Sequence, residues 1–174
     1  MLGFVMMAMN VARTFGAGLK YIYTRPLLIN ALRTNGNHAE LLCKSEPTTY
    51  FGAVGAAIKA GAMAASRDLS VITGITAPTY DAQGQAILMG WSTLLSKTKL
   101  ALGAAVGGIA IGASKGFPPI LVIILAVVVA IGFLRLYFFK AEVERCIVRA
   151  RAEILPEVDR SLADGRYAYP PQPR

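Results

Sequence analysis

The chain has 174 residues, of which 55% are hydrophobic and 16% are charged, and its formal net charge is +8. A charged fraction below the roughly 25% of soluble domains, together with 17 glycines, indicates a membrane protein. Nucleic-acid binding is not indicated by the basic balance, because no basic cluster with interleaved aromatic residues and no CxxC pair occurs.

Residues 1–49 are predicted to form a basic amphipathic segment followed by a loop. Four basic residues precede the first acid, Glu40, and the first apolar run ends at Ala12. That run is too short to cross a bilayer, which takes about twenty residues. An acid-free amphipathic start is typical of a mitochondrial transit sequence, and also of an interfacial helix that is never cleaved. Both interpretations stay open, and we expect retention.

Residues 50–66 combine alanine and glycine at helical spacing, so small side chains form two neighbouring rows on one helix. Such a helix buries little area but lets its backbone approach a neighbour closely. Lys59 lies in the middle of the segment and should snorkel or face a polar partner, because an intramembrane lysine is costly. The predicted packing residues of this segment are Gly52, Ala53, Ala56, Ala57 and Gly61.

The next stretch is predicted to be a connection followed by a short helix. Residues 69–80 contain Pro78 and several β-branched residues, which favour a connection with some strand propensity. Residues 82–96 are uncharged, but fifteen helical residues cover only about 22 Å of a hydrocarbon core about 30 Å thick. Whether this segment crosses the membrane stays open.

Two apolar segments follow, and the first is rich in glycine. Residues 100–114 lie between Lys99 and Lys115, and residues 116–134 are uncharged up to Arg135. Lipid tails are as apolar as leucine, so membrane helices associate through close packing, which small residues permit. Residues 116–134 are the clearest predicted span. The predicted packing residues here are Gly103, Gly107, Gly108, Gly112 and Gly116.

The C-terminal region, residues 140–174, is predicted to leave the membrane. Apolar residues recur from Val143 to Ile154 at spacings of three and four, with both charge signs between them, which indicates an amphipathic helix on the solvent side. Pro156 should break or restart it. The proline-rich end, residues 167–174, should be extended. It is either a disordered tail or a strap on a neighbouring subunit.

The sequence therefore predicts an all-α membrane protein with three to four transmembrane helices packed through glycine and alanine. Its regions are the N-terminal segment (1–49), a transmembrane helical domain (50–139), and the amphipathic helix with its extended tail (140–174). The cations expected to set the interface and topology are Lys59, Lys97, Lys99, Lys115, Arg135 and Lys140.

Catalytic, metal and cofactor sites are not predicted. His38 is the only histidine, and Cys43 and Cys146 match no metal or redox spacing. A serine or cysteine nucleophile would therefore lack its usual partners. We expect no cofactor, although the sequence leaves room for a bound phospholipid.

Two stretches resemble the mitochondrial inner-membrane translocase (Tim) family, which includes a translocase-like accessory subunit of respiratory complex I. "TTYFGAVGAAIKAGAMAAS" is similar to the family's first helix, and "ALGAAVGGIAIGAS" to its third, with Gly107 and Gly108 at the doubled glycine. The resemblance implies a four-helix protein of the inner membrane. The short second helix and the 34-residue C-terminal extension depart from the family pattern.

The resemblance implies one of two functions. Working translocases of the family place acidic residues in the membrane, whereas the predicted spans here contain no Asp or Glu. We therefore expect a non-catalytic accessory subunit of an inner-membrane complex, with complex I (NADH dehydrogenase) first. Its partners would be other membrane subunits and the lipid bilayer. The alternative is a translocase or pore subunit for proteins or small solutes.

Orientation is left open by two conflicting arguments. The positive-inside rule would place the side with Lys97, Lys99, Arg135 and Lys140 in the matrix. The family topology would place the C-terminus in the intermembrane space.

Overall fold

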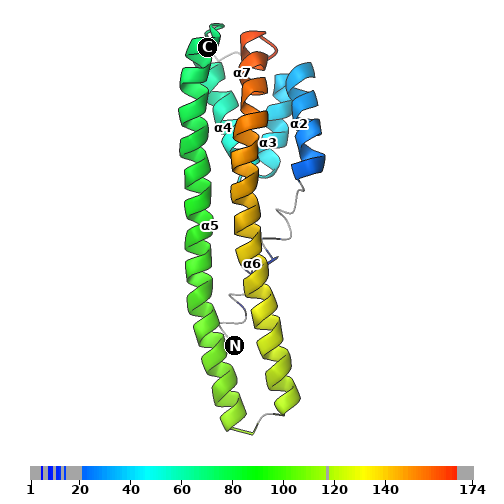
Figure 1. The fold of residues 1–174 in the computed structure, drawn as a ribbon, viewed down its shortest axis with the longest axis vertical. Coiled ribbons are helices and arrows are strands. Elements are labelled where there is room, and N and C mark those ends of the chain that lie inside the picture. Colours follow the sequence, from blue (N-terminus) through cyan, green and yellow to red (C-terminus); the bar gives the residue numbers. More distant parts are fainter. Residues whose placement is uncertain are drawn as a thin grey trace, which may run out of the picture. The chain divides into compact units, whose positions relative to one another are not determined.

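In a computed structural model, the chain is described at residues 5, 8, 9, 11, 12, 14, 21–116 and 118–167. Along these residues the regular structure is helical and no strand occurs, which confirms the all-α prediction. The helices, coloured from blue to red along the chain in Figure 1, are α2 (Tyr21–Thr34), α3 (Gly36–Ser45), α4 (Tyr50–Met63), α5 (Leu69–Ser114), α6 (Pro119–Glu153) and α7 (Leu155–Ala163).

The chain divides into two compact units. One unit, here called the hairpin unit, contains residues 1–18 and 89–142, and the other, the head unit, contains residues 19–88 and 143–174. Helices α5 and α6 each contribute residues to both units. The head unit is therefore built from two separate stretches of sequence. Residues 89–142, which include the turn between α5 and α6, separate these two stretches.

Local sequence signals explain where the short helices of the head unit begin. The Asn35 side chain caps α3 by accepting a hydrogen bond from the Asn37 amide at 3.0 Å. Thr49 caps α4 in the same way through the Phe51 amide, and Pro47 lies just before it. These capping interactions place three helices within the 43 residues from 21 to 63.

The core of the head unit forms around α4, which lies beside α3 and α7 (Figure 1). Tyr50, Val54 and Ile58 of α4 are at most 2% exposed. Tyr50 also makes an edge-to-face contact with Tyr21 of α2, with ring centroids 5.2 Å apart. Large side chains thus alternate with alanine and glycine on α4, and the small ones allow the neighbouring helices to come close.

Polar contacts of the head unit join segments that are distant in sequence. The Tyr80 hydroxyl donates to the backbone carbonyl of Ile147 at 2.8 Å, which links α5 to α6. Ser161 of α7 donates to the carbonyl of Leu32 at the same distance. The Arg33 guanidinium makes two hydrogen bonds to the Glu157 carboxylate. The last two helices are thereby held to α2 and α5.

In the hairpin unit, the two long helices pack along one seam. Trp91 of α5 lies edge-to-face on Phe139 of α6 with ring centroids 5.0 Å apart, and Ala105 and Val129 form a buried cluster further along. Gly116 has a φ of +84°, a backbone conformation that glycine adopts without a Cβ penalty. Gly116, one of the predicted packing residues, lies in the turn that follows α5.

Three boundaries differ from the sequence predictions. Residues 69–80, predicted to be a connection, form the first turns of α5. The predicted helices 82–96 and 100–114 are parts of that same helix, and α6 continues from the apolar span through most of the predicted amphipathic helix to Glu153. Pro78 is accommodated inside α5, where Thr79 donates to the carbonyl of Ile75 at 2.7 Å. A lysine such as Lys97 makes the surface of a helix more polar, but it does not end the helix.

Some predictions fall partly outside the described residues. Of the predicted N-terminal segment 1–49, residues 21–34 and 36–45 form α2 and α3, and before them only six residues are described. Residues 168–174 of the predicted proline-rich tail lie outside the described residues.

Candidate functional site

Two helices among the described residues are long and apolar enough to cross a membrane. The most apolar window of α5 has a mean hydropathy of 1.4 with 22% of it buried, and that of α6 has a mean hydropathy of 2.8 with 11% buried. Large apolar side chains point outward on both helices, including Leu100 (78% exposed) and Ile120 (72% exposed). Exposed apolar side chains along both helices are compatible with contact with lipid or with other protein.

The apolar parts of the two helices have matching lengths. Residues 100–114 of α5 and residues 119–134 of α6 carry no charge. At about 1.5 Å per residue each covers about 22 to 24 Å, a little less than the ~30 Å hydrocarbon core. Both segments begin at the tip around Lys115 and end near Lys99 and Arg135, so one slab of lipid of this thickness would enclose both.

A row of small residues lies on the outer face of α5 in this apolar segment. At about 100° per residue, Gly107, Ala110 and Ser114 lie within 40° of Gly103 around the helix axis. All four are exposed, and a Cβ added at Gly103 or Gly107 would meet nothing within 4 Å. We call Gly103, Gly107, Ala110 and Ser114 the small-residue stripe.

The stripe faces away from the seam between the two helices. Ala101, Ala105 and Gly112 are buried and lie about 160° to 200° around the helix from Gly103. Gly108 is exposed with nothing within 4 Å of an added Cβ, and it lies about 140° from Gly103. The structure thus separates the predicted glycines of α5: Gly112 lies on the buried face, and Gly103, Gly107 and Gly108 on open faces.

The predicted small residues of α4 pack inside the head unit. A Cβ added at Gly52 would lie 2.1 Å from the backbone oxygen of Pro47, and one added at Gly61 would lie 2.5 Å from Leu162. Ala53 and Ala57 are fully buried. Ala56 is half-buried, so this small-residue helix closely contacts segments of its own chain.

The predicted cations lie on three helices and in one turn. Lys97 and Lys99 are exposed on α5, and Lys115 is exposed in the turn that follows it. Lys140 is half-buried on α6, and Lys59 is exposed on α4. Lys59 lies close enough to Glu40 to help lower the pKa of that carboxyl, although the larger causes are hydrogen bonds from Lys44 and Tyr167. The prediction that Lys59 snorkels or faces a polar partner inside a membrane stays a prediction.

Arg135 connects the apolar hairpin to the N-terminal segment. Its Nε donates to the Thr14 hydroxyl at 3.1 Å, and Thr14, which is fully buried, donates in turn to the Val11 carbonyl. Val11 also packs against the cluster of Ala105 and Val129. Val11 and Thr14 of the N-terminal segment are thus packed on the hairpin, which the sequence pattern did not indicate.

A buried carboxylate is the least expected polar feature of the head unit. Asp159 of α7 is 5% exposed and accepts hydrogen bonds from Thr76 at 2.6 Å and from Thr73 at 2.9 Å. Both threonines belong to α5, 83 and 86 residues earlier in the sequence. The arrangement docks α7 on α5 through charge-assisted hydrogen bonds.

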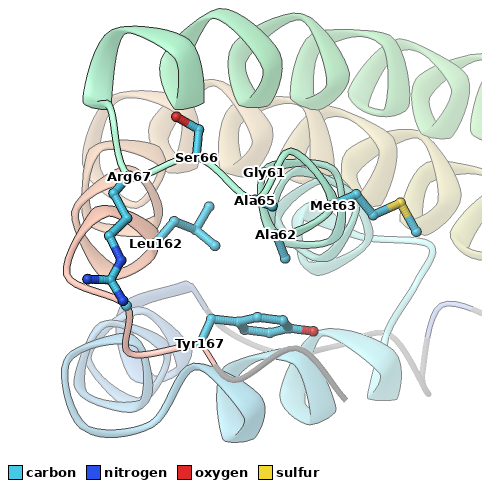
Figure 2. Close-up of a pocket in the computed structure, with 9 residues that line it drawn as sticks. Gly61, Ala62, Met63, Ala65, Ser66, Arg67, Leu162 and Tyr167 are labelled. Carbon is cyan, nitrogen blue, oxygen red and sulfur yellow. The ribbon is translucent and has the colours of Figure 1, made fainter. Parts of the chain in front are cut away.

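A cavity of about 630 Å³ opens where α4 and α7 end (Figure 2). Arg67 and Tyr167 lie at its rim, and Leu162 lies between the two helices in the close-up. Tyr167 donates a hydrogen bond to Glu40. The lining has one cation and no carboxylate, and no three His, Cys, Asp or Glu residues come together among the described residues.

The comparisons with known proteins add no family to this description. No protein-family model, curated protein or solved structure matches the chain.

Proposed function

We propose that this protein is a non-catalytic accessory subunit of a larger membrane complex, in which α5 and α6 form a two-helix anchor. One observation carries the proposal: the uncharged segments of α5 (residues 100–114) and α6 (residues 119–134) present apolar side chains outward, and the small-residue stripe on α5 has no partner within the described chain. Large side chains on the rest of the surface suit lipid. A stripe of small side chains suits the backbone of another helix.

The proposal has two spans where the sequence predicted three to four. Helix α4 is 14 residues long, about 21 Å, and its small residues already contact segments of the head unit. We propose that the head unit lies outside the lipid. Its ion pairs, such as Arg33 with Glu157 and Arg151 with Asp81, have partly exposed side chains and suit contact with water.

For the host complex we propose the mitochondrial inner membrane and respiratory complex I. This part of the proposal rests on the resemblance to the Tim family in residues 48–66 and 101–114. The anchor would fill a seam between larger subunits, and the head unit would hold neighbours outside the membrane. A translocase or pore subunit is the competing function.

The test changes the stripe and leaves the fold of the chain intact. Tagged full-length protein would be expressed in its native membranes, and its comigration with a large complex would be followed on native gels. Replacing both Gly103 and Gly107 by leucine should release the protein from the complex, since the added side chains would hold a partner helix away. Gly108→Leu is the matched control, because it lies on another open face of the same helix.

The outcomes separate the alternatives. Wild-type protein that migrates alone contradicts an accessory role. Equal release by the stripe variant and by Gly108→Leu contradicts the assignment of the partner to the stripe. Loss of presequence import on depletion, with respiratory complexes still assembled, would favour the translocase function.

A further inference from the structure

Four cations lie at the base of the apolar hairpin, and two packing contacts of the hairpin unit indicate their relative levels. Trp91 is beside Phe139, and Ala105 is in one cluster with Val129. Interpolating between these two contacts places Lys97 and Lys99 at the level of about residues 133 to 135 of α6, because the helices run antiparallel.

These levels bring the base cations into one band. Arg135 is thus level with Lys97 and Lys99. Lys140 is next to Phe139 and lies about one to two helical turns further from the tip than Arg135. We call Lys97, Lys99, Arg135 and Lys140 the cationic collar.

The collar surrounds the seam and does not lie on one side of it. Thr98 is fully buried in the seam, so its neighbours Lys97 and Lys99, each about 100° away around the helix, point to opposite sides. Both lysines are exposed. Arg135 lies next to the buried Leu136 on α6 and reaches Thr14. Positive charge is therefore presented around the base of the hairpin.

Little negative charge offsets the collar. Glu142 is the only acid in the sequence between residues 82 and 143, whereas Lys115 is the only cation between residues 100 and 134. The base of the hairpin thus has four cations against one acid, and the tip has one cation.

Aromatic side chains lie at the same level as the collar, including Trp91, Phe139 and Tyr137. Aromatic and cationic side chains together are typical of the headgroup region of a bilayer.

We propose that the cationic collar binds the headgroups of anionic phospholipids in the leaflet at the base of the hairpin. This inference rests on the proposed membrane function. It adds that the leaflet at the base of the hairpin must contain lipids with anionic headgroups. Charge complementarity selects the occupant, because phosphate groups with net negative charge match a ring of ammonium and guanidinium groups. The tip, with Lys115 alone, would show much weaker selectivity.

The single tryptophan of the chain, Trp91, reports on this level directly. Full-length protein would be reconstituted in phosphatidylcholine vesicles containing a small fraction of spin-labelled phosphatidylglycerol or, in parallel, spin-labelled phosphatidylcholine. The label would be placed near the headgroup end of the acyl chain, and quenching of Trp91 fluorescence would be measured. We expect stronger quenching by the anionic lipid at equal mole fraction.

Removing positive charges from the collar should weaken the preference for the anionic lipid, and each further charge removed should weaken it more. Lys99→Gln should reduce the relative affinity for the anionic lipid by up to about fivefold, and the triple variant Lys97→Gln, Lys99→Gln, Lys140→Gln should abolish most of it. Lys115→Gln is the matched control at the tip and should leave Trp91 quenching unchanged. Circular dichroism would check that the variants keep their helix content. If the triple variant loses it, Lys99→Gln and the salt dependence of the wild type decide the test.

Three results would overturn the inference. These are equal quenching by the two lipids, an equal effect of Lys99→Gln and Lys115→Gln, and a preference that survives high salt, which screens charge attraction. Selective displacement by inorganic phosphate, relative to chloride at equal ionic strength, would assign the collar to a soluble anion instead. Absence of quenching by either lipid would contradict the proposed membrane function itself.

Discussion

The glycine at position 52 should stabilise the head unit relative to alanine, although alanine is normally the better residue inside a helix. Gly52 is in the first turn of α4, and a Cβ built on it would lie 2.1 Å from the Pro47 carbonyl oxygen and 2.9 Å from the carbon of that carbonyl. Both atoms belong to the backbone, so no side-chain rotation can relieve the contact. Gly52→Ala must therefore move the segment that carries the Thr49 cap.

The size of the effect follows from two opposing contributions. Alanine in place of a helical glycine stabilises by about 1 kcal/mol. Overpacking against a fixed neighbour costs about 1 to 3 kcal/mol, and disturbing an N-cap costs about 1 kcal/mol more. We expect Gly52→Ala to destabilise the head unit by about 1 to 3 kcal/mol. Gly74→Ala in α5 meets nothing within 4 Å and should stabilise by about 1 kcal/mol.

The assay should report on the head unit alone. Cys43 is 3% exposed and its Cβ lies 2.9 Å from the position of a Cβ on Gly55 of α4, so its thiol becomes accessible when α3 and α4 separate. Labelling of Cys43 during a temperature ramp, quantified by peptide mass spectrometry, gives a midpoint for each variant. That midpoint should fall for Gly52→Ala and rise for Gly74→Ala. Equal shifts, or a rise for Gly52→Ala, would refute the steric reasoning.

Two further predictions concern the buried polar groups of the head unit. Thr76→Val should destabilise it by about 1.5 to 3 kcal/mol, because the Asp159 carboxylate loses a charge-assisted hydrogen bond. Thr79→Val, whose hydroxyl only returns to its own helix, should cost less than about 1 kcal/mol, and equal losses on thermal unfolding would contradict this assignment. Burial raises the pKa of the Cys43 thiol to about 12, so at pH 8 a maleimide should modify the half-buried Cys146 well before Cys43. Faster labelling of Cys43 in the folded protein would show that its burial is wrong.

The sequence supported the helical class and the need for close packing, because both depend on local composition. It could not identify the medium in which the small residues pack. Alanine and glycine at helical spacing look the same whether the neighbour is a helix in lipid or a segment of the same chain. On α4, Gly52 and Gly61 meet Pro47 and Leu162, whereas Gly103 on α5 meets nothing in the described chain.

Helix boundaries and long-range contacts were the least predictable features. Pro78 and the lysines near residue 98 suggested breaks, yet α5 runs through them. The contact of Asp159 with its threonines joins residues more than eighty positions apart, and no spacing rule connects them. The same holds for Arg135 and Thr14, which are 121 positions apart.

The interrupted sequence of the head unit has a consequence for biogenesis. Asp159 and Ser161 belong to α7, and their partners, such as Thr76 and Leu32, are synthesised long before them. Residues 19–88 therefore wait with an incomplete interior until the whole intervening segment has emerged. A ribosome that stalls within residues 89–142 would release a chain with unfilled apolar surface, a substrate for chaperones and proteases. The interior of the head unit can therefore be completed only after its second stretch, residues 143–174, has been synthesised.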